Sequence, residues 1–191
     1  MKPERRAAAV TAALSAVEAL ADTQGWGAYP ALLGLFDSTA HTRVGSLDVE
    51  ELPIDPSVWQ LHAMPGASLR VPYWVGLRAV AESLTTVKAR ELRAWTRAQL
   101  GPMVAMAFLG EGLDTSDAGR QAAAAHGLPA DPGGIPVRAV TAHDIDGRVY
   151  QMLRMRGAST ITTVTVDEPT PQMHPSVVAA SLRRLLNAAR A

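Results

Sequence analysis

Three strand-like segments near the C-terminus constrain the fold of this chain more than any other feature. Residues 137–157 and 159–168 contain three segments rich in branched side chains. Asp146-Gly147 separates the first two segments, and this dipeptide is a preferred two-residue hairpin turn because both positions accept positive φ. Strands joined by so short a turn pair antiparallel. The sequence therefore predicts a sheet in which antiparallel pairing dominates.

The rest of the chain alternates between helical and strand-like patterns. Apolar spacing predicts helices over 4–22, near 56–62, over 73–100 with a break at 85–86, and over 115–127 and 175–190. Strands are predicted over 31–38, 44–54 and 103–113. The run 103–113 is apolar at successive positions, so we expect it near the sheet centre with both faces buried. In the first helix, the buried stripe is expected to contain Val10, Leu14, Val17, Leu20 and Ala21.

These segments predict an α+β fold in the order α-β-β-α-α-β-α-β-β-β-α. We expect a single, mainly antiparallel sheet of five to six strands with flanking helices, within one domain that spans 1–191. The element order is similar to that of profilin-like and GAF-like sensor and scaffold folds. Because that likeness rests on element order alone, it says little about function.

Composition removes several classes of function. The chain has 18 basic and 18 acidic residues, so its formal net charge is zero, which argues against a dedicated nucleic-acid binder. It has no cysteine, which excludes disulfides, thiolate metal sites and a cysteine nucleophile. We find no export signal and no apolar run long enough for a membrane span, so we expect a cytoplasmic protein without membrane contact.

The stretch 143–157 gathers polar groups and raises the question of a catalytic or metal site. If Asp146-Gly147 forms the turn, Ile145 lies opposite Arg148 and His143 opposite Tyr150. Asp144 then falls on the other face, so no three ligands converge and we expect no metal site. One face would be a candidate anion-binding face, made of His143, Arg148, Tyr150, Arg154 and Arg156. An ordinary hairpin with solvated charges is the favoured alternative.

A second polar group follows the predicted central strand. Glu111, Asp114 and Asp117 could serve catalysis with His143 or His174 as a partner, or they could be turn and capping residues. The five histidines are scattered and favour no metal site. The glycine-rich 131–136 lacks the residues of a phosphate-binding loop, and no nucleophile elbow or dinucleotide fingerprint is present. We therefore predict no cofactor.

Aromatic residues in irregular segments are the features that most favour a binding surface. Trp26, Trp59, Tyr73 and Trp74 lie in or beside predicted loops, where aromatics are enriched at interfaces. We expect these residues to bind a protein partner, although covering the open edge of the core is the alternative interpretation.

Together these observations favour a non-catalytic protein-binding or assembly module. Its partner would be another protein or a second copy, with a homodimer formed through the last helix or an edge strand. Arg outnumbers Lys by 16 to 2, a skew typical of GC-rich genomes, so a structural protein of an actinobacterial phage or mobile element is one version. The alternatives are a small-molecule-sensing regulatory domain, and a small hydrolase or transferase that uses the carboxylates near 111–117.

Overall fold

A six-stranded antiparallel sheet forms the centre of the molecule, with strand order β2-β1-β3-β4-β5-β6. The computed structural model describes residues 1–38, 46–60, 73–129, 133–166 and 176–191. The strands are β1 (Ala31–Phe36), β2 (Asp48–Glu51), β3 (Met103–Asp114), β4 (Ile135–Asp144), β5 (Val149–Met155) and β6 (Thr162–Val166). The predicted α+β class and the antiparallel sheet are confirmed.

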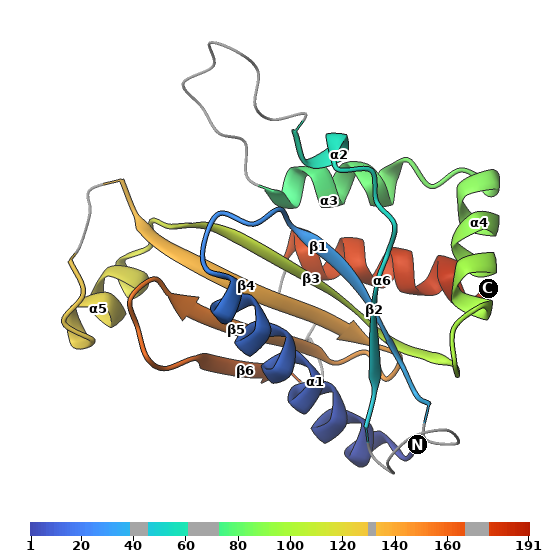
Figure 1. Cartoon of the computed structure of the whole chain (residues 1–191), viewed down its shortest axis with the longest axis horizontal. Helices are drawn as coiled ribbons and strands as arrows, with labels where there is room; N and C mark the ends of the chain where they lie inside the picture. Colours follow the sequence, from blue (N-terminus) through green and yellow to red (C-terminus); the bar gives the residue numbers. More distant parts are fainter. Residues whose placement is uncertain (39–45, 61–72, 130–132, 167–175) are drawn as a thin grey trace.

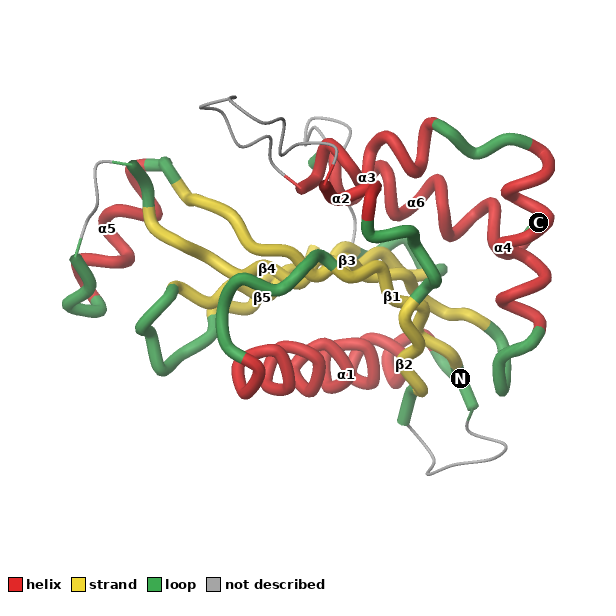
Figure 2. Tube along the Cα trace, turned by 45° about the horizontal axis from the view of Figure 1, so that its top comes forward, coloured by secondary structure: helices red, strands yellow, loops and turns green. Residues whose placement is uncertain are grey.

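Helices cover both faces of this sheet. They are α1 (Pro3–Gln24), α2 (Ser57–Gln60), α3 (Tyr73–Glu82), α4 (Thr86–Arg97), α5 (Asp117–Ala125) and α6 (Val177–Arg190). Figures 1 and 2 show α1 on one face, α2, α3, α4 and α6 on the other, and α5 beyond one end of the β3–β4 pair. Within the described ranges, no helix has both the length and the apolar character needed to cross a membrane.

The two larger cores follow from the alternation of side chains along the strands, and a smaller cluster joins Ala123 of α5 to β4 and β5. On the α1 face, Ala105 and Ala107 of β3 pack with Val10 and Leu14 of α1. The neighbouring position Met106 points to the opposite face, where α6 supplies its buried leucines. Because β3 is buried on both faces over Met103–Phe108, the prediction of a central strand is confirmed.

Polar caps set the boundaries of several helices. Thr85 accepts a hydrogen bond from the backbone N–H of Lys88 and begins α4, so the predicted break at 85–86 is confirmed. Ser116 and Ser176 cap α5 and α6 in the same way. Each cap satisfies a backbone donor that the first helical turn leaves without a partner.

The β4–β5 hairpin has a longer loop than the sequence predicts. Asp144 lies opposite Arg148, and residues 145–147 form the loop, with Gly147 at φ 90°. The Asp144 carboxylate accepts hydrogen bonds from the backbone N–H groups of Asp146 and Arg148, both at 2.9 Å, which stabilises the wider turn. The two-residue turn is therefore wrong, and so is the predicted pairing of His143 with Tyr150.

The corrected register moves every pair along this hairpin by one residue. His143 lies opposite Val149, and Ala142 lies opposite Tyr150. A one-residue shift exchanges the faces of one strand relative to the other. Tyr150 therefore shares the α1 face with Ala142, while His143 points to the opposite face.

Candidate functional site

The predicted anion-binding face does not form as one surface. Tyr150 is buried beneath α1, and its hydroxyl donates to Asp144 Oδ2 at 2.6 Å. His143 is buried on the other face of the sheet. Arg148 and Arg154 lie on the α1 face and bind carboxylates of the chain itself, Asp146 and Glu18. An incoming anion would meet these carboxylates and not a free cationic surface.

Burial determines the protonation behaviour of both ring systems. The pKa of the Tyr150 hydroxyl is raised, first by burial and then by its hydrogen bond to Asp144. The pKa of His143 is lowered, mainly because burial removes water from the charged imidazole, although the hydrogen bond to the Asp144 carbonyl opposes this effect. Tyr150 and His143 are therefore held neutral near neutral pH.

An ionic cluster joins the C-terminal half of α1 to the sheet. It consists of Glu18, Asp22, Glu111, Arg138 and Arg154. The buried carboxylate of Glu18 accepts two hydrogen bonds from Arg154, at 2.6 and 2.7 Å. Arg138 donates to Glu111 at 3.1 Å and lies 3.7 Å from Glu18. Each buried charge faces an opposite one, which greatly reduces the free-energy penalty of its burial.

This ionic cluster was missed from the sequence, although two signals were present. Glu18 lies one turn after Leu14 on the buried stripe of α1, whereas Leu20, which was expected on that stripe, is 61% exposed. In β4, Arg138 shares the α1 face with Val140. An acidic residue on the apolar face of a helix and a basic residue on the apolar face of a strand together indicate a buried ion pair.

Trp26 adds an aromatic contact to the ionic cluster. The Arg138 guanidinium lies 4.5 Å from the centre of the Trp26 ring, and that of Arg156 lies 5.7 Å away. Such cation–π contacts stabilise an Arg side chain over an aromatic face. The half-buried Trp26 ring therefore already contacts the chain's own arginines.

Trp59 and Trp74 do not extend a surface around Trp26. Trp59 is 5% exposed and packs against Phe108, so it belongs to the core. Trp74 is 39% exposed at the start of α3, which covers the opposite face of the sheet from α1. Tyr73 begins α3, and its side chain lies outside what the structure describes.

The three carboxylates at the end of the central strand and the start of α5 do not converge. Glu111 accepts from the backbone N–H of Gly27 at 2.8 Å and binds Arg138 on the α1 face. Asp114 accepts from the backbone N–H of Ser116 just before α5. Asp117 pairs with Arg120 within α5. These are anchoring, turn and helix roles, which agree with the alternative interpretation of this segment.

The histidines are equally separate from these carboxylates. His126 ends α5, and His143 faces the opposite side of the sheet from Glu111. His41, His62 and His174 lie outside the described residues. In the part of the chain that the structure describes, no group of three or more histidine, aspartate or glutamate side chains could hold a metal ion.

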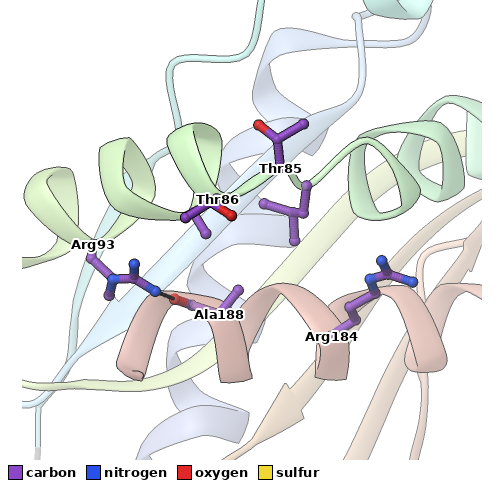
Figure 3. A pocket seen from close by; sticks show the side chains of 7 residues that line it. Thr85, Thr86, Arg93, Arg184 and Ala188 are labelled. Carbon is purple, nitrogen blue, oxygen red and sulfur yellow. Dashed lines mark hydrogen bonds between the residues drawn. The ribbon is translucent and has the colours of Figure 1, made fainter.

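An open groove of about 360 Å³ lies between α4 and α6 (Figure 3). It is lined by Leu84, Thr85, Thr86, Ala89, Arg93, Arg184 and Ala188. Arg93 points across it and donates to the carbonyl oxygen of Ala188 at 3.4 Å. A sensing domain is expected to have an apolar cavity between sheet and helices. This groove between two helices does not match that expectation.

The edge of the sheet at β6 is a second candidate for a binding site. We call the side of β6 that faces away from β5 the β6 edge; no strand of the described residues pairs with it. Thr162, Thr163, Val164 and Thr165 are all exposed, and Val164 is 48% exposed. The β5–β6 ladder runs without a register shift. A regular edge strand presents unpaired backbone N–H and C=O groups to a further strand.

The opposite edge, at β2, has a different character. Its four residues read Asp48-Val49-Glu50-Glu51, so three of them are acidic. Glu50 and Glu51 are exposed. Charged side chains are one of the devices that prevent an edge strand from pairing with another chain. The β6 strand has neither a charge nor a proline.

Comparisons of the chain with protein-family models, curated protein sequences and solved structures find no match. The geometry of the molecule is therefore the basis for a functional proposal.

Proposed function

We propose that this protein is a non-catalytic assembly module that joins another protein chain by pairing a strand with the β6 edge. The observation that carries the proposal is the exposed, regular and uncharged ladder of β6. Addition of a strand to a sheet edge is a recurrent mode of protein recognition, in which backbone hydrogen bonds supply affinity.

The polar side chains of the sheet support a binding role over a catalytic one. Catalysis by acid and base groups requires side chains that reach a common substrate position. Glu18, Glu111 and Asp144 instead bind Arg154, Arg138 and Tyr150 of the same chain. These contacts stabilise the fold, and they leave backbone groups at the sheet edge as the means of recognition.

Site-specific photocross-linking tests the proposal in cells that naturally contain the protein. One variant carries a photoreactive amino acid at Thr163 on the β6 edge. The matched control carries it at Glu50, an exposed position in the opposite edge strand. Mass spectrometry then identifies any adduct.

We expect a discrete adduct from Thr163 and none from Glu50, because only the β6 edge would lie against a partner. Absence of an adduct at Thr163, or equal adducts at both positions, would refute the assembly role of β6.

A further inference from the structure

We propose that the partner at the β6 edge is a second copy of this chain, paired antiparallel through its own β6 about a two-fold axis at Val164. This inference rests on the proposed function, and it specifies the partner. The axis is perpendicular to the sheet, because antiparallel neighbours in one sheet share the same faces. The dimer therefore has one continuous sheet with both α1 helices on the same face.

The charges of the two edges favour this pairing over the alternatives. Two copies of β6 meet without like charges, because residues 162–166 contain no ionisable side chain. If two copies of β2 paired antiparallel, acidic side chains such as Asp48 and Glu50 of one copy would lie beside acidic side chains of the other. Like charges that lie opposite each other destabilise a sheet. If β6 of one copy paired with β2 of another, the β2 carboxylates would find no positively charged partner, because β6 has no ionisable side chain. Such head-to-tail pairing would also leave a free edge at each end and produce an open-ended chain of molecules.

The length of β6 determines the register. All five residues pair only when Thr162 lies opposite Val166 of the second copy, which places Val164 opposite its own counterpart. A shift by one residue would shorten the ladder and exchange the faces of one strand. In the full register, Thr163 lies opposite Thr165, and Val164 opposite Val164. Both are pairs of branched side chains that favour strands.

The size of the contact sets the strength of the dimer. Stable interfaces bury about 1,200–2,000 Å² in total, which is more than one five-residue strand supplies. We therefore infer a dimer that forms and dissociates with protein concentration.

Disulfide trapping tests both the partner and the register, because the chain has no native cysteine. The variant Val164→Cys places two thiols across the axis, at a Cα separation of about 4.5–5.5 Å that suits a disulfide. The control Thr162→Cys is also at an exposed position in the same strand, but its counterpart lies four residues further along, about 13 Å away. Purified variants are oxidised under identical mild conditions.

We expect Val164→Cys to form a covalent dimer at least tenfold faster than Thr162→Cys. Equal rates, or no covalent dimer from Val164→Cys, would overturn the self-pairing. A different protein cross-linked at Thr163 in cells, together with no trapped dimer, would reject the second copy as the partner and retain the proposed function. No adduct in cells and no trapped dimer would reject both.

Discussion

The two edges of the sheet differ in their readiness to pair. β2 carries Asp48, Glu50 and Glu51, whereas β6 consists of threonine and valine, and its described side chains are exposed. Both edges expose backbone groups, so side-chain charge is what distinguishes them. The difference teaches that the charges which hinder strand pairing lie at the β2 edge and are absent from the β6 strand.

The strands beside the two edges are also held in different ways. β1, next to β2, packs Leu33 and Leu35 into the apolar core beneath α1. β5, next to β6, contacts α1 through the Arg154–Glu18 pair as well as through buried Tyr150. Removing one partner of a buried ion pair leaves the other charge without compensation and strongly lowers stability. Apolar packing contains no such pair. We therefore expect β5 to depend on the Arg154–Glu18 pair; on the other side, the charged contact is at the end of β1, where Asp37 pairs with the Met1 amino group at 3.0 Å.

The largest expected effect comes from Glu18→Gln. This change leaves the half-buried Arg154 without its main carboxylate, so we expect the free energy of unfolding to fall by about 3 kcal/mol. Asp22 lies 3.6 Å from Arg154 and limits the loss. Urea denaturation measures the change, and Glu4→Gln, at an exposed site on the same helix, is the control. A change below about 0.5 kcal/mol would contradict the dependence of β5 on this pair.

The next effect concerns association through β6. In Val164→Lys, two ammonium groups would face each other across the two-fold axis, so we expect dimer affinity to fall at least tenfold, about 1.4 kcal/mol. Sedimentation velocity measures the change. Val87→Lys, at a position 52% exposed in α4, is the control and should keep the affinity of the unchanged protein. Equal dimer affinity for Val164→Lys and Val87→Lys would contradict association through the β6 edge.

A smaller effect, on the size of the assembly, should follow when acidic side chains are removed from β2. The double variant Asp48→Thr, Glu50→Val gives β2 a pattern like that of β6, so a second weak contact should form and produce assemblies larger than a dimer. Light scattering at increasing concentration detects them. A mass that never exceeds the dimer would show that charge alone does not protect the β2 edge.

The smallest effect is a pH dependence at His143, in the strand next to β5. Its pKa in the folded state lies below the unfolded value of 6.5, so the unfolded state binds the additional proton. This contribution to stability is full above about pH 6.5 and is lost as the pH falls through the folded pKa. The difference between the urea midpoints of unfolding at about pH 7.5 and about pH 5.5 should therefore be smaller in His143→Gln than in the unchanged protein. An identical difference would assign the pH dependence to other groups.

The arrangement of the fold was largely predictable, because it depends on local patterns. A continuous apolar run located the central strand at 103–113, and the Thr85-Thr86 pair located the break at 85–86; both agree with the structure. The β4–β5 register was not predictable from turn preference alone. Asp144 stabilises the wider loop with its side chain, and Ile145 donates its N–H to Val104 of β3, which is a long-range contact. The single domain over 1–191 stays a prediction.

The candidate site was less predictable, because it depends on strand order. Residues 159–168 were recognised as a strand, but whether a strand lies at an edge depends on contacts distant in sequence. The position of Trp59 was not predictable for the same reason, since it packs against Phe108 of the central strand. Charges on apolar faces, such as Glu18, were the one local signal that remained unused.

Hydrogen exchange of both edges at two protein concentrations tests the central claim most directly. We expect the backbone amides of 162–166 to exchange more slowly in concentrated than in dilute solution, because pairing of β6 protects its outward N–H groups. The amides of 48–51 should exchange at the same rate in both solutions. Concentration-independent exchange at β6, or protection at β2 instead, would contradict the assignment of β6 as the assembly edge.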